Sequence, residues 1–123
     1  MVLNCLAVGA GGFIGAVCRY GVGLLPVKET TLFPVKTLAV NLLGCFMIGI
    51  IAVLAMKNLL PSLRWGLFFQ TGICGGFTTF STFALETNVL LRNGHTSLAV
   101  LYVFLSVILG LGLTVAALVW LGE

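Results

Sequence analysis

Long apolar runs alternate with short polar connectors along the whole chain of 123 residues. A helix needs about 20 residues to cross the ~30 Å hydrocarbon core of a bilayer. Four runs reach this length and predict transmembrane helices over residues 2–25, 37–56, 65–91 and 98–121. The polar connectors between them cover residues 26–36, 57–64 and 92–97. We therefore expect an all-α membrane protein with four transmembrane helices per chain, forming one transmembrane domain over residues 1–123.

The third run is interrupted near its middle by a Gly-Gly pair and a series of hydroxyl residues, in the segment 71–83. Consecutive glycines each cost about 1 kcal/mol in a helix, so we predict that this helix is broken at its centre, near residues 75–79. Inside a bilayer the freed backbone groups must be buried in protein or line a cavity. The freed carbonyls could hold a cation, and a helix N-terminus favours an anion. A simple kink, with Ser and Thr bonding back to the backbone, is the alternative.

Two phenylalanines follow the predicted break. Phe80 and Phe83 are three residues apart and lie on one helical face. The edge of a phenyl ring carries a partial positive charge, so two rings presented edge-on could contact a small anion without trapping it. Packing against other apolar side chains is the ordinary alternative for phenylalanine on a membrane helix.

Other runs also carry polar side chains at helical spacing. Thr37 and Asn41 are four residues apart on the second run, and Tyr102, Ser106 and Thr114 belong to a stripe of period four on the fourth run. Each side chain taken alone is typical of hydrogen bonding between helices. Together they place neutral donors on three helices, and such donors can replace the water shell of an anion.

The composition excludes several classes of function. Hydrophobic residues make up 60% and charged residues 7% of the chain, against roughly 25% charged residues in a soluble domain. One histidine and three acidic residues leave little acid–base machinery, so we do not expect an enzyme. The net charge of +3 is scattered, whereas a nucleic-acid partner needs a clustered basic face.

Two charged residues lie inside or near the ends of the apolar runs. Glu86 is the only acid within a run, which makes it a functional candidate, with a vestibule or helix-cap role as alternatives. Arg19 lies near the end of the first run. It either snorkels to the membrane interface or makes a vestibule attractive to anions.

The basic residues are almost evenly divided between the two sides of the membrane. With four spans, Lys57 and Arg64 lie on one side, and Lys28, Lys36 and Arg92 lie on the other. An excess of Lys and Arg on one side normally orients a membrane protein. Because the excess is so small, we hypothesise that the chain inserts in both orientations and pairs as an antiparallel dimer.

At these residues the sequence resembles the CrcB, or Fluc, fluoride channels of bacteria. The resemblance is carried by Gly11, Gly12, Gly15, Arg19 and Tyr20 in the first run, by residues 37–44 in the second, and above all by residues 71–83 in the third. It implies an antiparallel dual-topology homodimer in the bacterial inner membrane, which exports fluoride passively from the cytoplasm and needs no nucleotide.

The resemblance also implies roles for individual residues. A sodium ion at the centre of the dimer interface would be bound by the backbone carbonyls of Gly75 and Thr78. Phe80 and Phe83 would contact fluoride, and Asn41 would donate its amide nearby. The remaining polar lining would come from Ser81, Thr82, Tyr102, Ser106 and Thr114, with Arg19, Glu86 and Thr37 at the vestibules.

A small multidrug-resistance transporter and a non-conducting packing subunit are the alternative functions. Small multidrug-resistance transporters also have four spans and dual topology, but they rely on a glutamate in the first span, where this chain has no acid. A non-conducting packing subunit would not require hydroxyl residues on three spans or a helix break beside phenylalanine rings.

Overall fold

The computed structural model describes residues 1–28 and 32–123; residues 29–31, inside the predicted connector 26–36, lie outside the described residues. The described part is helical and contains no strand. Its α-helices are α1 (Val2–Gly23), α2 (Val35–Met56), α3 (Leu63–Gly66), α4 (Gly75–Phe77), α5 (Phe80–Arg92) and α6 (Thr96–Gly122), and a π-helix, η1 (Leu67–Cys74), joins α3 to α4. The expected all-helical class is therefore confirmed.

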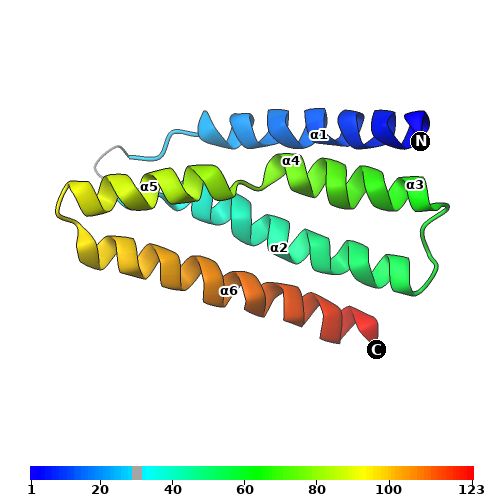
Figure 1. Cartoon of the computed structure of the whole chain (residues 1–123). Coiled ribbons are helices and arrows are strands. Elements are labelled where there is room, and N and C mark those ends of the chain that lie inside the picture. Colours follow the sequence, from blue (N-terminus) through cyan, green and yellow to red (C-terminus); the bar gives the residue numbers. More distant parts are fainter. Residues whose placement is uncertain (29–31) are drawn as a thin grey trace.

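The helices run lengthwise as a bundle, with α1 on one side and α6 on the other (Figure 1). Among the described residues, α1, α2 and α6 are each long and apolar enough to cross a membrane. The predicted third span, residues 65–91, is divided instead among α3, η1, α4 and α5. None of these pieces alone has the length of a span.

The predicted break lies at Thr78 and Thr79, both of which have extended backbone conformations between α4 and α5. Its position agrees with the prediction, but Gly75 and Gly76 remain helical. The sequence also did not predict the π-helix η1. Such π-helical turns are rare and are found frequently at functional sites.

Gly76, just before the break, and Gly15 on α1 lie where two helices pack closely. A Cβ atom on Gly15 would clash with the carbonyl oxygen of Ile73 and lie 2.8 Å from the backbone nitrogen of Phe77. A Cβ on Gly76 would lie 3.0 Å from the Cα of Gly12. Small residues on the first helix therefore allow close approach between α1 and the η1–α4 segment.

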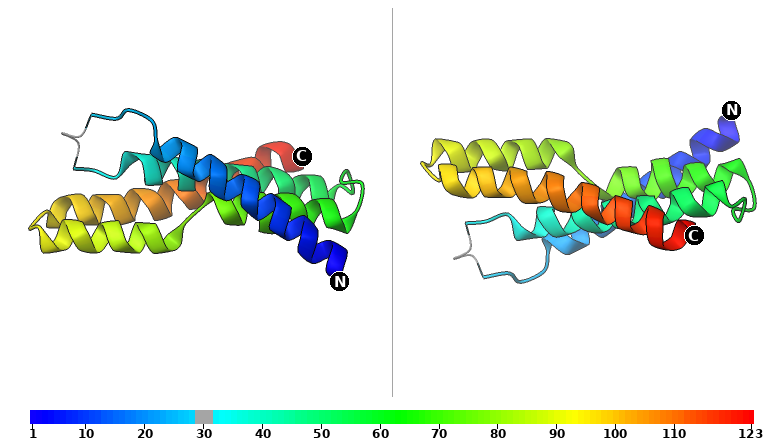
Figure 2. Two further views of the ribbon diagram at one scale, coloured as in Figure 1. Left: turned by 90° about the horizontal axis from the view of Figure 1, so that it is seen from above. Right: turned by 90° about the horizontal axis from the view of Figure 1, so that it is seen from below.

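The segments before and after the break pack against different helices. Before it, η1 and α4 pack against α1; after it, α5 packs against α6, which in turn packs along α2. Figure 2 shows α1 crossing the α3–α4 segment obliquely, while α5 and α6 lie side by side as a hairpin. The break thus allows one chain segment to pack against two different helices.

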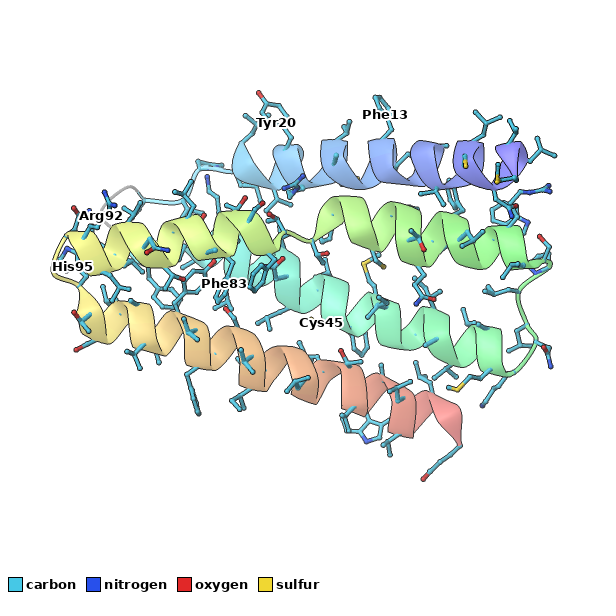
Figure 3. The ribbon with its side chains drawn as sticks, viewed as in Figure 1. Phe13, Tyr20, Cys45, Phe83, Arg92 and His95 are labelled. Atoms are coloured by element: carbon cyan, nitrogen blue, oxygen red, sulfur yellow. The ribbon has the colours of Figure 1, made fainter. Side chains whose placement is uncertain are left out.

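A small core lies inside the α5–α6 hairpin. Leu90, Ala99 and Tyr102 are buried there, and Phe33 and Phe83 pack around them. In contrast, Phe13 and Tyr20 project from the outer side of α1 and are 71% and 69% exposed (Figure 3). Apolar side chains this exposed suit contact with lipid or with another protein surface.

Candidate functional site

Asn41, in the N-terminal half of α2, binds the backbone at the helix break. Its side-chain Nδ2 donates to the carbonyl oxygen of Thr79 at 3.0 Å, and the backbone N–H of Thr79 donates to its Oδ1 at 2.8 Å. Only one orientation of the amide satisfies both bonds. The side chain therefore pairs with both backbone polar groups of one residue at the break.

The Thr79 side chain then begins the next helix. Its Oγ1 accepts a hydrogen bond from the backbone N–H of Thr82 at 3.2 Å, which makes Thr79 the N-cap of α5. The same hydroxyl donates to the Thr82 Oγ1 at 3.0 Å and lies 3.4 Å from the Ser81 Oγ. Both predicted lining hydroxyls, Ser81 and Thr82, are thus in contact with this cap.

The sequence alone did not indicate a role for Thr79. The signal was present, because a threonine directly before a helical segment is a common N-cap. It was hidden because Thr78 and Thr79 are adjacent and chemically identical. The side chain of Thr78 instead donates back to the carbonyl of Cys74 at 2.8 Å, as the kink alternative would have it.

The break frees backbone carbonyls on its α4 side. In an unbroken helix the N–H of Thr79 would donate to the carbonyl of Gly75, but here it donates to Asn41. Gly75 and Thr78 line a cavity of about 290 Å³ together with Asn41, Thr79 and Phe80, and the remaining lining residues are Gly44, Cys45, Ile48, Gln70 and Cys74. The described residues hold no cluster of three or more His, Cys, Asp or Glu side chains that could ligate a metal. Carbonyl oxygens are a donor type that suits a hard cation, so the freed carbonyl of Gly75 could serve as a ligand.

The two phenylalanines differ in their surroundings. Phe80 is 79% exposed, and its ring centroid lies 5.5 Å from that of Phe83. Phe83 points toward the inside of the bundle (Figure 3) and meets Tyr102 edge-to-face at 5.1 Å. Phe83 is therefore partly a packing residue, whereas Phe80 presents its ring outside the chain.

Glu86 contacts hydroxyl groups from two neighbouring helices. Thr37 on α2 donates to its Oε1 at 2.7 Å, and the Tyr102 hydroxyl on α6 donates to its Oε2 at 2.8 Å. The carboxylate therefore cross-links three helices, and the cap of α5 is provided by Thr79 instead. The predicted lining residue Tyr102 is fully buried, with its hydroxyl directed to Glu86.

The remaining hydroxyls of the predicted α6 stripe behave differently from one another. Thr114 donates to the backbone carbonyls of Cys45 and Gly110, at 3.0 and 3.1 Å, and so bonds α6 to α2. The Ser106 hydroxyl is buried and has no hydrogen-bond partner among the described residues. A buried polar group without a partner is costly, which makes Ser106 the member of the stripe with free capacity for a ligand.

A second cavity lies on the other side of the break. It has a volume of about 350 Å³ and is lined by Arg19, Lys36, Thr37, Thr79 and Thr82, with Ala16, Tyr20, Val22, Gly23 and Val40 completing the wall. Thr79 lines both cavities. Of the predicted vestibule residues, the structure brings Arg19 and Thr37 to this cavity, and it adds Lys36, which the sequence did not indicate.

Comparison with known proteins identifies the family. The family described as "CrcB-like protein, Camphor Resistance (CrcB)" matches residues 6–120. The chain belongs to this family. The resemblance stated from the sequence is therefore correct, and the protein is a bacterial multi-pass membrane protein.

Several relatives share the name fluoride-specific ion channel FluC. The protein from Chlorobium chlorochromatii (strain CaD3) is 50% identical over 107 residues, which cover 87% of this chain and 83% of the relative. The one from Chlorobaculum tepidum is 53% identical over 100 residues, covering 81% and 79%. The one from Oceanobacillus iheyensis is 44% identical over 110 residues, covering 89% and 84%.

Replacing Asn41 by leucine should destabilise the protein by about 2 kcal/mol or more. The change leaves the N–H and carbonyl of Thr79 without partners, and each unsatisfied buried group costs roughly 1–3 kcal/mol. Thermal unfolding of the detergent-solubilised protein measures the effect. Asn88→Leu is the matched control, because the Asn88 side chain donates to the Ala84 carbonyl of its own helix. Equal melting temperatures for the two variants would contradict the assigned role of Asn41.

Proposed function

We propose that this protein is a fluoride-selective ion channel that lets fluoride leave the cytoplasm passively. The observation that carries the proposal is the helix break held by Asn41, directly before the two phenylalanine rings. The name shared by the relatives, fluoride-specific ion channel, supports the same ion. On this proposal the protein is a channel and not an enzyme.

The site has the chemistry that a small anion requires. A dehydrated fluoride ion needs hydrogen-bond donors or positive ring edges, but a fixed cation beside it would hold it too tightly for conduction. Around the break, Asn41, Ser81 and Thr82 are neutral, and Phe80 and Phe83 supply ring edges. The cation Arg19 lines the adjoining cavity, where it would raise the local fluoride concentration.

The proposed pathway continues along α6. The full set of lining residues is Asn41, Phe80, Ser81, Thr82, Phe83, Tyr102, Ser106 and Thr114. The unpartnered hydroxyl of Ser106 supports this route most directly. The Tyr102 hydroxyl already donates to Glu86, and the Thr114 hydroxyl already donates to the carbonyl of Cys45. These two residues would therefore act on the ion indirectly, by orienting the groups to which they bond.

Passive export follows from the acid–base chemistry of fluoride. Hydrogen fluoride is neutral and crosses a bilayer from acid surroundings, then dissociates at the higher pH inside the cell. The trapped anion accumulates and needs only a selective route down its electrochemical gradient. No nucleotide and no nucleic acid takes part.

The proposed assembly is an antiparallel homodimer of four-span chains. Phe80 is 79% exposed and Gly75 is also exposed, so residues on both sides of the break face the outside of a single chain. Exposed carbonyls at membrane depth need protein cover, and a second copy in the opposite orientation would supply it. The nearly balanced basic residues of the connectors support this arrangement.

A structural sodium ion would lie between the two copies. The carbonyls of Gly75 and Thr78 from each chain would give it four oxygen ligands, which is the donor type that hard cations prefer. The observation in this chain that supports these ligands is that the Gly75 carbonyl does not accept the helical hydrogen bond from Thr79, whose N–H donates to Asn41 instead.

A small multidrug-resistance transporter is not favoured. Such a protein needs a free membrane glutamate, and Glu86, the acid within a span, is held by Thr37 and Tyr102. It also lies on α5 and not on the first span.

Purified protein in liposomes loaded with fluoride should release the ion, as followed with a fluoride-selective electrode, and should retain chloride under the same gradient. Phe80→Ile and Phe83→Ile should slow fluoride release by about tenfold or more, because the aliphatic side chain has no positive edge. Phe13→Ile is the control, since Phe13 is similarly exposed but projects away from the bundle. Equal passage of chloride, or unchanged release by both variants, would refute the proposed pathway.

Reporters fused to the C-terminus should be active on both sides of the membrane if the chain inserts in two orientations. A phosphatase that works only outside the cytoplasm and a fluorescent protein that works only inside form a suitable pair. Activity of a single reporter would rule out dual topology.

Gly75→Lys should separate the proposed dimer without harming the single chain. A Cβ at this position approaches nothing closer than the Gln70 carbonyl at 4.0 Å, so the side chain fits one copy, but its charge would lie at the interface and displace sodium. Light scattering with size-exclusion chromatography measures the mass. Gly122→Lys, which has open space far from the break, is the control and should stay dimeric. A dimeric Gly75→Lys protein would argue against this interface and its cation.

A further inference from the structure

Lys36 joins the ends of two helices beside the cavity that contains Arg19. Its ammonium Nζ donates to the carbonyl oxygen of Gly23 at 2.7 Å. Gly23 is the last residue of α1, and Lys36 lies in the first turn of α2. The bond therefore links two helix ends that are thirteen residues apart in the chain.

The helix dipoles explain the direction of the lysine side chain. A cation is unfavourable at the N-terminus of its own helix and favourable at the C-terminus of another. The first turn of α2 contains no acidic residue, and the last turn of α1, which the structure describes in full, contains no basic one. By reaching across to Gly23, Lys36 supplies the missing charge to α1 and caps a carbonyl that the helix leaves unpaired.

The same bond bears on the position of Arg19. Arg19 precedes Gly23 by four residues, so both lie on one face of α1. Both residues line the cavity of about 350 Å³, as do Lys36 and Thr37. Thr37 in turn donates to Glu86, so the α2 side of this cavity is itself held in place. Fixing Gly23 against α2 therefore fixes Arg19 relative to the hydroxyls of Thr79 and Thr82.

We propose that Lys36 is a positioning residue, which ties the C-terminal turn of α1 to α2 and so holds Arg19 at the mouth of the fluoride pathway. The effect on transport rests on the proposed channel function. The anchoring of α1 does not rest on that function, and it can be measured without fluoride.

Hydrogen–deuterium exchange tests the anchor directly. The backbone amides of Leu24 and Leu25 donate to carbonyls in the last turn of α1, so they should exchange faster in Lys36→Gln when this turn loosens. Lys36→Arg keeps the charge and the donors and should exchange as the wild type does. Lys57→Gln, at the other end of α2, is the matched control and should have no effect. Unchanged exchange at Leu24 and Leu25 in Lys36→Gln would overturn the proposal.

Fluoride release from liposomes tests the consequence for transport. At low fluoride, Lys36→Gln should release the ion about fivefold more slowly than the wild type, and Lys36→Arg should restore the rate. In a double-mutant cycle, Lys36→Gln should add little to Arg19→Gln, because the lysine acts through the arginine.

The outcomes separate this inference from the proposed function. Independent, additive effects of the two substitutions, or a low rate in Lys36→Arg, would overturn the positioning role. A wild-type protein that releases no fluoride would instead refute the channel proposal, and the exchange measurement would still decide whether Lys36 anchors α1.

Discussion

The structure depends on one pair of hydrogen bonds, between the Asn41 amide and the backbone of Thr79. A helix break at membrane depth exposes polar groups that lipid cannot satisfy. A single amide pairs with both groups of the residue at the break, and the Thr79 hydroxyl then caps the helix that follows. The backbone can thus change direction without leaving the Thr79 groups unpaired, and the ring of Phe80 begins directly after it.

Close packing of α1 determines where the other half of this segment lies. Glycines on both sides of the contact bring the backbones of α1 and the η1–α4 segment so close that a methyl group on Gly15 would collide with Ile73. After the break the chain packs against α6 instead. The two cavities lie on either side of the residue at which this change of neighbour occurs, and Thr79 lines both of them.

Charge is scarce in this protein, and the structure uses what there is to hold helices together. Glu86 accepts hydroxyl bonds from α2 and α6, and Lys36 bonds the end of α1. Neutral donors and aromatic edges remain around the break itself. On the proposed function, such a site would bind a small anion weakly enough for it to leave, because its attraction would come from partial charges.

The sequence by itself determined the helical class, the approximate position of the break and the family. These follow from the length of the apolar runs and from the segment 71–83, both of which are local properties of the chain. The sequence also placed Asn41 among the site residues, although its partner was not identified. Only the tertiary structure decided that Thr79 is that partner, that Glu86 bonds to Thr37 and Tyr102, and that Lys36 reaches Gly23. Each of these contacts joins residues that are 13 to 49 positions apart in the chain. They depend on how the helices are rotated against one another, which no local pattern specifies. The glycines illustrate the same limit: their low helix propensity suggested that they form the break, but Gly75 and Gly76 remain helical, Gly76 in close contact with Gly12 of α1, and the break lies at the two threonines that follow.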